Sequence, residues 1–398
     1  MSNGFTTKIL HSDLEAPIEH NSVHKPMHAA VAFGYADSRE LARVFKGEAA
    51  GYAYGRQGNP TTAALESKVS KMEDGIATAC FATGMAAIAS TFVALLRAGD
   101  HVVSSSFLFG NTNSLFGTFN TQGFDISFVD PTDVANVERA IKPNTRMVFV
   151  ETIANPRTQV ADLARIGELC AKHNLIYVVD NTMTSPYLYR PKCDKASLVI
   201  NSLTKYIGGH GNALGGSVTD TGLYDWTKFS NIYDNYKNAK PALWGIQQIR
   251  KKGLRDVGAT LAAEPAHRLA TGAETLALAR FLQAHPKVTK VYYPGLDDHL
   301  QHKLASELFK CYGALMSIEL ADGIDCFDFL NRLELVISSS HLGDNRTLAI
   351  PIAQTIYWEM GAARRAEMGI AESLIRLSIG IEDQEDLIGD FRQALEKS

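Results

Sequence analysis

Residues 175–182 read LIYVVDNT, an apolar run that ends in an aspartate and polar turn residues. Four other short runs rich in β-branched residues occur in the chain: HVVSS at 101–105, DISFVD at 125–130, MVFVET at 147–152 and ASLVINS at 196–202. Stretches with the apolar spacing of helices separate these runs. Such alternation predicts βαβ units and an α/β fold with a mainly parallel sheet.

The segment between two of these runs has the features of a crossover helix. Asp162 is expected to cap its start, and Lys172, His173 and Asn174 supply its C-terminal stop. Its apolar positions fall on one face: Leu163, Ile166, Leu169 and Cys170. The distance along the chain from MVFVET to LIYVVDNT, roughly thirty residues, is that of one crossover unit.

The composition and periodicity of the sequence change at two points along the chain. Residues 1–50 carry scattered His and Pro with weak periodicity, which predicts an extended N-terminal arm of the kind that wraps a partner subunit. A large domain is expected over 51–250 and a second domain over 251–398, where a long helical stretch at 259–284 leads to KVTKVYYPGL. The uncharged stretch 75–96 is interrupted by Thr, Ser and Gly, so we expect a strand end, a turn and a buried helix there.

Composition excludes several classes of protein. The 398 residues are 45% hydrophobic and 21% charged, which is typical of a globular chain. The formal net charge is −4 and no basic block occurs, so nucleic acid is not an expected partner. The five cysteines are far apart and form no C-x-x-C pair, which favours buried free thiols in the cytoplasm. The first residues lack the apolar core of a signal peptide, and no membrane helix is expected.

Several catalytic and metal-binding patterns are incomplete or absent in the sequence. His20, His24 and His28 have helical spacing, but Pro26 would break that helix, so no metal site is expected. The chain contains no H-E-x-x-H, G-x-S-x-G or P-loop motif. An NAD-dependent oxidoreductase is a weak alternative, because the parallel sheet allows it but G-x-G-x-x-G is absent.

Three other features share one chemistry. Asp180 ends an apolar strand, at the edge where ligands bind in open parallel sheets. Lys205 follows the next apolar run, in NSLTKYIGGHGN at 201–212, whose glycines let the backbone approach a ligand closely. In ATGMAAI at 82–88 a helix is expected to start so that the amides of Gly84 and Met85 face an anion. Taken alone, Asp180 would cap a turn and Lys205 would be a solvated surface group.

Together these three features describe what pyridoxal phosphate requires. The lysine amine would bind the aldehyde of the cofactor, the carboxylate would keep the pyridine nitrogen protonated, and the helix amides would hold the phosphate. The combination is more specific than any of its parts.

At these residues the chain resembles the Cys/Met metabolism family of pyridoxal-phosphate (PLP) enzymes, which includes cystathionine γ-synthase, cystathionine γ-lyase, methionine γ-lyase and O-acylhomoserine sulfhydrylase. The matching stretches are GYAYGRQGNPTTAALE (51–66), ATGMAAI (82–88), VETIANP (150–156), VVDNT (178–182), NSLTKYIGGHG (201–211), VYYPGL (291–296), HLGDNRTL (341–348) and LIRLSIGIED (374–383). The resemblance implies the fold of type I PLP-dependent transferases, with a large PLP-binding domain and a smaller C-terminal α/β domain.

The resemblance also implies roles for individual residues. Lys205 would hold the cofactor and move protons between the substrate carbons. Asp180 would pair with the pyridine nitrogen, and Asn155 and Glu151 would lie near the phenolic oxygen of the ring. Phe109 would stack on the ring. The phosphate ligands would be Gly84, Met85, Ser202 and Thr204.

Further roles concern the substrate and the assembly. Arg376 would clamp the substrate α-carboxylate, a task suited to its planar pair of donors. Tyr54 and Arg56 would reach the phosphate of a neighbouring subunit, which implies a homo-oligomer, a dimer of active dimers. Taken alone, Arg376 would be a surface ion pair.

The sequence departs from the family pattern near the expected substrate. Phe109 stands where the family usually has Tyr, so a hydroxyl that passes protons is missing. Asn111 stands where methionine γ-lyases carry a reactive Cys, which reduces support for methionine as the substrate. In AIPIAQTIYWE, at 349–359, Thr355 is retained but both family His residues are absent, and His341 replaces a small or amide residue. We expect Thr355 and His341 to be substrate-binding residues.

The expected activity is γ-replacement or γ-elimination on a γ-substituted L-amino acid. Because Phe109 has no hydroxyl to donate a proton to the leaving group, the sequence favours an O-acylhomoserine substrate, as in a sulfhydrylase or a cystathionine γ-synthase. The alternative is a γ-lyase with an unusual leaving group, of the cystathionine, methionine or canavanine type. A binding protein or inactive paralogue is the competing class, and it would be expected to tolerate loss of Lys205.

Overall fold

The large domain is built on a seven-stranded sheet. The computed structural model describes residues 4–12, 18–229, 245–247, 249 and 273–398. Along the sheet the strand order is β1-β7-β6-β5-β4-β2-β3. Strands β2 to β6 are parallel, and β7 is antiparallel to both of its neighbours. The strands are β1 (Ala77–Phe81), β2 (His101–Ser105), β3 (Asp125–Val129), β4 (Thr145–Glu151), β5 (Ile176–Asp180), β6 (Leu198–Asn201) and β7 (Gly216–Asp220). The predicted mainly parallel sheet is confirmed.

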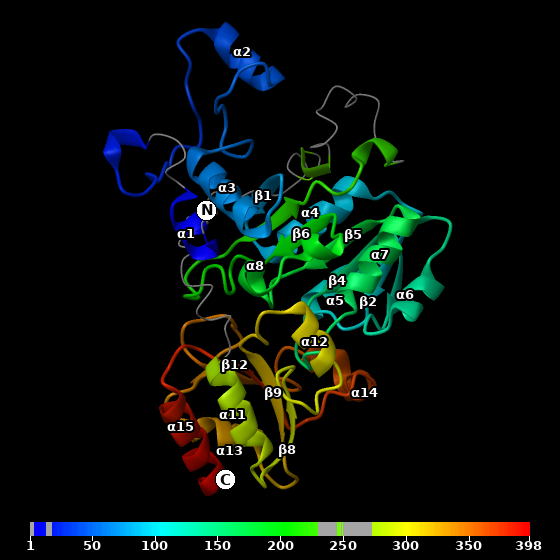
Figure 1. Cartoon of the computed structure of the whole chain (residues 1–398), viewed down its shortest axis with the longest axis vertical. Helices are drawn as coiled ribbons and strands as arrows, with labels where there is room; N and C mark the ends of the chain where they lie inside the picture. The colour runs from blue at the N-terminus through cyan, green and yellow to red at the C-terminus, as the bar shows by residue number, and fades with distance from the viewer. Residues whose placement is uncertain (1–3, 13–17, 230–244, 248, 250–272) are drawn as a thin grey trace.

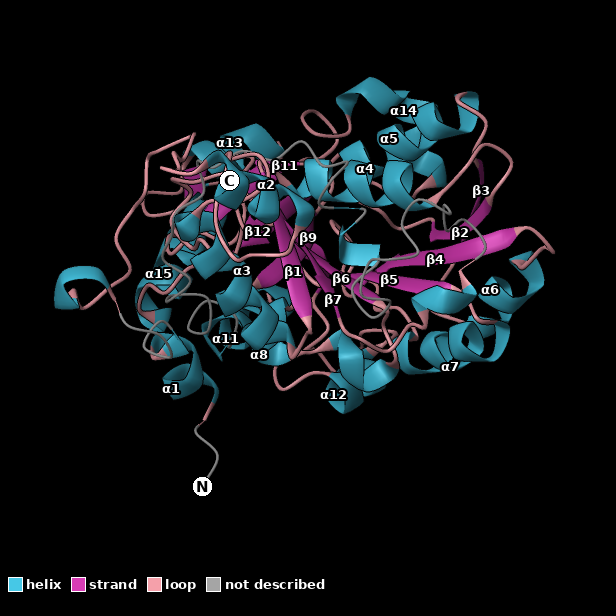
Figure 2. Ribbon diagram, turned by 90° about the horizontal axis from the view of Figure 1, so that it is seen from above, coloured by secondary structure: helices cyan, strands magenta, loops and turns pink. Residues whose placement is uncertain are grey.

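Both faces of this sheet are buried under helices (Figure 2). One face packs in a cluster that contains Phe92, Phe116 and Phe149, and the other packs in a cluster that contains Ile166 and Tyr177. Because both faces are covered, the strands read as continuous apolar runs instead of alternating ones. The helices of this domain are α3 (Pro60–Glu73), α4 (Gly84–Leu95), α5 (Gly110–Thr121), α6 (Val134–Ala140), α7 (Leu163–His173) and α8 (Ser185–Leu188).

Helix α7 is the predicted crossover, with one correction. It ends at Asn174 in the left-handed conformation, as the polar stop indicates. Asp162 stands at its N-cap position, but the carboxylate makes no capping hydrogen bond. It lies 3.5 Å from the guanidinium of Arg165 instead, so the ion pair takes the place of the expected cap.

The C-terminal domain carries a second sheet, of order β10-β11-β12-β9-β8 (Figure 1). Its strands are β8 (Val288–Tyr292), β9 (Leu315–Leu320), β10 (Ile337–Ser338), β11 (Leu348–Pro351) and β12 (Leu374–Ser378). Its helices are α11 (Ala273–Gln283), α12 (His302–Leu308), α13 (Cys326–Asn331), α14 (Gly361–Glu367) and α15 (Gln384–Lys397). The predicted boundary at 250 and the predicted helical stretch from 259 to 272 lie outside the described residues.

The N-terminal segment is only partly an arm. Helix α1 (Phe5–Leu10) packs on α3, with Ile9 buried against Val69 and Met72. Helix α2 (Ser38–Lys46) projects away from the body of the subunit (Figure 1). Four short 3-10 helices also lie in the described ranges: Glu19–Asn21, Pro191–Asp194, Trp226–Lys228 and Trp358–Met360.

All five cysteines are free thiols. Cys80, Cys170 and Cys326 are buried, whereas Cys193 is exposed, against the expectation of buried thiols. In the described ranges no helix is long and apolar enough to cross a membrane.

Candidate active site

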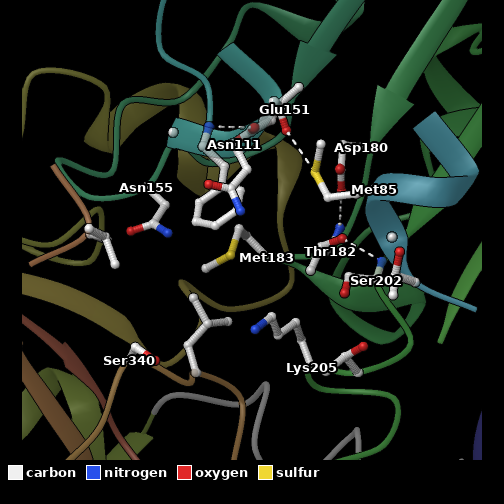
Figure 3. A pocket seen from close by; sticks show the side chains of 18 of the residues that line it. Met85, Asn111, Glu151, Asn155, Asp180, Thr182, Met183, Ser202, Lys205 and Ser340 are labelled. Carbon is white, nitrogen blue, oxygen red and sulfur yellow. Dashed lines mark hydrogen bonds between the residues drawn. The ribbon is translucent and has the colours of Figure 1, made fainter. Parts of the chain in front are cut away.

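A cavity of about 650 Å³ lies where the carboxyl ends of the parallel strands meet the C-terminal domain (Figure 3). Strands β4 and β5 contribute Glu151 and Asp180 at their last positions. The turn after β6 contributes Ser202 and Lys205. Strand β12 of the other sheet contributes Arg376. Residues far apart in the sequence therefore meet in one site of a size suited to a cofactor with its substrate.

Lys205 extends into this cavity from the turn that follows β6 (Figure 3). Its backbone N–H donates to the carbonyl of Ser202 at 3.1 Å, which fixes the turn. Burial lowers the pKa of its ammonium to about 8, and the positive charge of Arg376 contributes in the same direction. The amine is therefore closer to neutral at physiological pH than a solvated lysine.

Two carboxyl groups face the cavity from neighbouring strands. Glu151 and Asp180 are register partners in the pairing of β4 with β5. The backbone N–H of Thr182 donates to Asp180 Oδ1 at 3.0 Å, and that of Phe109 donates to Glu151 Oε1 at 2.8 Å. Burial raises the pKa of both carboxyls, and the charge of Asp180 raises the pKa of Glu151 further. A cationic group bound beside Asp180 would offset this cost.

The start of α4 forms a cradle next to this pair. Thr83 is its N-cap, and its hydroxyl accepts from the amide of Ala86 at 3.0 Å. The first amides of a helix have no partner within the helix, so those of Gly84 and Met85 remain for a ligand. A Cβ on Gly84 would lie 2.9 Å from the Cβ of Ser202, so only glycine allows this close approach of the two segments.

Thr204 lines the cavity as expected, but its hydroxyl is bonded to the glycine-rich turn. Its hydroxyl donates to the carbonyl of Gly215 at 3.2 Å and accepts from the amide of Gly215 at 3.0 Å. A hydroxyl has one hydrogen to donate. The side chain therefore holds the glycine-rich turn and, in this arrangement, has no hydrogen left for a phosphate.

Arg376 is a buried cation at the opposite side of the site, with 2% of its surface exposed. Its Nη2 donates to the carbonyls of Ser340 and His341, both at 2.9 Å, and its Nε is buried without a partner in the described residues. Burial lowers its pKa to about 10, which leaves it charged at neutral pH. The remaining guanidinium donors suit a carboxylate.

The other predicted residues fall into three groups. Phe109, Asn155 and Thr355 line the cavity, and Asn155 Oδ1 is buried without a partner in the described residues. His341 contacts Lys205, with its Nδ1 3.4 Å from Nζ, while Ser340 and Leu342 on either side of it line the cavity. Tyr54 and Arg56 lie at the surface outside this lining, with the Arg56 guanidinium 5.5 Å from the centroid of the Tyr54 ring.

Sequence reasoning missed several residues of the site. Leu214, Trp358 and Glu359 lie at its exposed edge, and the last two belong to the segment in which Thr355 was noted. Glu73 lies fully buried beneath the site, where its Oε1 accepts from Asn181 at 3.0 Å and Asn201 at 2.7 Å. Its position at the end of α3 carried no signal, because a helix-terminal Glu is usually solvated.

These residues fit pyridoxal phosphate. The Gly84 amide beside Ser202 forms an anion cradle, the raised pKa of Asp180 marks a place for a cationic ring nitrogen, and Lys205 supplies an amine whose pKa of about 8 makes it easier to deprotonate than a solvated lysine. The unpartnered Asn155 Oδ1 supplies a further polar contact. The fold and the site are those of a fold-type-I PLP-dependent enzyme.

Comparisons with known proteins define the family. A sequence model described as "Cys/Met metabolism PLP-dependent enzyme" matches residues 6–396, so the chain belongs to this family. It is 36% identical to an L-methionine gamma-lyase of Fusobacterium nucleatum subsp. polymorphum, over 94% of this chain and 93% of the other. It is 34% identical to a homocysteine synthase of Schizosaccharomyces pombe, over 99% of both chains.

Solved structures agree with this assignment. A cystathionine gamma synthase of Xanthomonas oryzae pv. oryzae has a TM-score of 0.86 and 29% identity, with coverage of 100% of this chain and 99% of the other. The cofactor of this chain is therefore pyridoxal 5'-phosphate, and the chain is a lyase or transferase that acts at the γ-carbon in sulfur amino-acid metabolism. The family is one of PLP-dependent enzymes, so the nicotinamide-dependent alternative is excluded.

Proposed function

We propose that the enzyme performs γ-replacement or γ-elimination on a γ-substituted L-amino acid, with an O-acylhomoserine as the preferred substrate. The observation that carries this proposal is the convergence of Lys205, Asp180 and Arg376 on one cavity. These residues provide a proton-transfer amine, an anion for the ring nitrogen and a cation for the substrate carboxylate.

Each group of residues has one task. The amides of Gly84 and Met85, with Ser202, would hold the phosphate, and the carboxylate of Asp180 would pair with the ring nitrogen. Asn155 would contact the phenolic oxygen, and Phe109 would stack on the ring face. Bound pyridoxal phosphate supplies an electron sink for negative charge that develops on the substrate.

Arg376 and Lys205 act on the substrate itself. Arg376 binds the α-carboxylate through the guanidinium donors that its bonds to the protein leave available. The Nζ lone pair of Lys205 would take the proton from Cα and give it up to the bound cofactor, which frees the amine to take the proton from Cβ. The electron pair of the Cβ–H bond would then form a Cβ–Cγ double bond as the γ-substituent leaves with the electron pair of its bond to Cγ. Because burial lowers the pKa of Lys205 to about 8, a useful fraction of the amine is neutral at physiological pH.

The absence of a hydroxyl on Phe109 favours leaving groups that depart without a proton. A carboxylate expelled from an acyl ester is such a group, whereas a thiolate from a thioether is more basic and gains more from an acid. Thr355 lies at the edge of the cavity, suited to contact the γ-substituent. A panel of substrates tested with and without sulfide or cysteine would show whether a nucleophile or water completes the reaction.

A second candidate is a γ-lyase for a substrate with a cationic γ-substituent, such as the guanidinooxy group of canavanine. The observation that favours it is the exposed pair of Trp358 and Glu359 at the cavity edge. A carboxylate and an aromatic ring together attract a cation. Such a leaving group also carries its own proton donors.

We further propose that the enzyme is a homo-oligomer in the cytoplasm, a dimer of active dimers. The exposed Tyr54 and Arg56 suit a role at the phosphate of a neighbouring subunit. Sedimentation of the pure protein tests the assembly, and a monomer with full activity would contradict it.

Two measurements test the function. Borohydride should bleach the yellow protein and leave a pyridoxyl group on Lys205, located by peptide mass spectrometry. A panel of O-acetylhomoserine, O-succinylhomoserine, cystathionine, methionine and canavanine, each with and without sulfide or cysteine, should then be scored for ammonia, oxo acid and replacement product. Highest turnover on an acyl ester supports the first candidate, highest turnover on canavanine supports the second, and turnover on methionine above both contradicts the role given to Phe109.

A further inference from the structure

His341 lies against the lysine that the proposed function makes the base. Its Nδ1 is 3.4 Å from Lys205 Nζ, within the range of a long hydrogen bond. The cavity itself is lined by its sequence neighbours, Ser340 and Leu342. The imidazole therefore contacts Lys205, the group that would act on the substrate.

The loop that carries His341 packs directly on the lysine turn. A Cβ on Gly343 would lie 2.8 Å from the amide nitrogen of Tyr206 and 2.9 Å from the carbonyl carbon of Lys205. A Cβ on Gly211 would lie 2.7 Å from Oδ2 of Asp344 and 3.3 Å from Cδ2 of His341, so the glycine makes room for both side chains. Both glycines have positive φ, at 74° and 60°. The contact between the two segments is thus built into their backbones.

The same loop is tied to Arg376. The Nη2 of Arg376 donates to the carbonyls of Ser340 and His341, and the amide of Gly343 donates to the hydroxyl of Ser378 at 2.9 Å. Strand β12 therefore holds both the proposed carboxylate clamp and the loop that reaches Lys205. The position of His341 relative to the substrate is set by one rigid element.

The protonation state of His341 suits an acceptor. Burial lowers its pKa to about 4, the charges of Lys205 and Arg376 lower it as well, and Asp344 acts in the opposite direction. The ring is therefore neutral at physiological pH. Its Nε2 is buried without a partner in the described residues. With the ring proton on Nε2, the lone pair of Nδ1 is available to Nζ.

We propose that His341 is a positioning residue whose Nδ1 accepts a hydrogen bond from Lys205 Nζ and holds the free amine in place for each proton transfer. The proposal rests on the proposed role of Lys205 as the base. It concerns orientation alone, so no bond other than this hydrogen bond is made or broken.

The first test measures Lys205 in the full-length chain freed of cofactor. Trace acetic anhydride is applied at a series of pH values, and mass spectrometry of the Lys205 peptide gives the midpoint of its reactivity. His341→Phe keeps a ring but removes the acceptor. Because a hydrogen bond favours the charged ammonium over the neutral amine, loss of the acceptor should lower the midpoint by about one pH unit. His341→Asn keeps an acceptor and should stay near wild type.

The second test is kinetic, on the holoenzyme with its best substrate. His341→Phe should lower kcat by about tenfold, the worth of one hydrogen bond, with KM unchanged. His341→Asn should restore most of kcat. His299→Asn is the matched control, because His299 is a similarly buried histidine whose pKa is also lowered to about 4 but which contacts Thr158.

The outcomes separate the two proposals. Equal labelling midpoints in wild type and His341→Phe would overturn the positioning role, as would equal kcat values. If His341→Phe does not fold, His341→Leu carries the same expectations and the same contrary results. If borohydride leaves no pyridoxyl group on Lys205, the proposed function fails, whereas the labelling midpoint still reports on the contact with His341.

Discussion

The floor and the rim of the active-site cavity are built in different ways. We call Gly84, Glu151, Asp180, Ser202 and Lys205 the cavity floor, and Leu214, Thr355, Trp358 and Glu359 the cavity rim. The floor residues lie at the ends of strands of the large-domain sheet, in the turn after β6 and at the start of α4. Hydrogen bonds from backbone amides and close contacts at glycine fix their positions. The rim comes from loops, and Leu214 and Trp358 are 65% and 64% exposed. From this contrast we propose that the floor sets the chemistry and the rim sets the choice of substrate.

The largest effect is expected at the floor. Lys205→Ala removes the amine that, in the proposed function, binds the cofactor and moves protons, so activity should fall by about 10³-fold or more. Initial rates on the best substrate and the borohydride adduct measure it. Lys303→Ala, at an exposed lysine of α12, is the control and should leave both unchanged. Substantial activity in Lys205→Ala would show that the floor does not set the chemistry.

Glu73 lies beneath the cavity floor, and its role can be tested by measuring the free energy of unfolding. Burial raises the pKa of Glu73 in the folded chain from its ordinary value of 4.5 to about 7. Between these two pKa values the folded state keeps the proton of Glu73, whereas the unfolded state has lost it. The protonated carboxyl therefore contributes fully to the free energy of unfolding below the pKa of the unfolded chain, and this contribution is lost as the pH rises through 7. Glu73→Gln keeps an acceptor for Asn181 and Asn201 but cannot ionise.

Urea unfolding at acidic and at alkaline pH measures this difference. Relative to wild type, Glu73→Gln should gain about 2–3 kcal/mol at the alkaline end, from the linkage of the shifted pKa to unfolding. Glu307→Gln, at an exposed glutamate that pairs with Lys303, should show no such gain. A parallel pH dependence in wild type and Glu73→Gln would mean that Glu73 does not ionise in this range.

Arg376 tests the side of the cavity that the C-terminal domain supplies. Arg376→Lys keeps a positive charge but loses the planar pair of donors, so kcat/KM should fall by about 10- to 100-fold, mainly through KM. Steady-state kinetics measure the split. Arg392→Lys, on the surface of α15, is the control. A loss confined to kcat would contradict a role in carboxylate binding.

Phe109 lies next to the cavity floor, and we propose that it affects which leaving groups the enzyme accepts. Phe109→Tyr restores a hydroxyl, and turnover of thioethers such as cystathionine should rise by about tenfold relative to acyl esters, as expected from one added hydrogen bond. Substrate competition measures the ratio. An unchanged substrate profile would show that the missing hydroxyl does not set specificity.

The smallest effect is expected at the rim. Glu359→Gln removes one exposed charge, so the preference for canavanine over O-acetylhomoserine should fall by no more than about fivefold. The ratio of the two kcat/KM values at low and high salt measures this effect. Glu385→Gln, at an exposed glutamate of α15, is the control. A rise in the preference for the cationic substrate would exclude a role for Glu359 in attracting it.

Much of the fold could be predicted because local patterns carry it. The five predicted strands are present with bounds within a few residues, since continuous apolar runs between helices specify buried parallel strands. The start of α4 at Gly84 was also predicted, because a Thr followed by good helix formers marks a helix start. Helix α1 was missed, because its weak periodicity hid the burial of Ile9 against α3.

The sequence by itself determined the floor of the site. Its parts are local features that can be recognised in the sequence: strand-end residues such as Asp180, the glycine-rich turn of Lys205 and the helix start at Gly84. The tertiary structure alone decided the rest. It placed Arg376 and His341 beside Lys205, bound the hydroxyl of Thr204 to Gly215 and buried Glu73 beneath Asn181 and Asn201. The physical reason is that these contacts join residues from 11 to more than a hundred positions apart. Their geometry arises only when the segments pack together, within the large domain for Thr204 and Glu73 and between the two domains for His341 and Arg376.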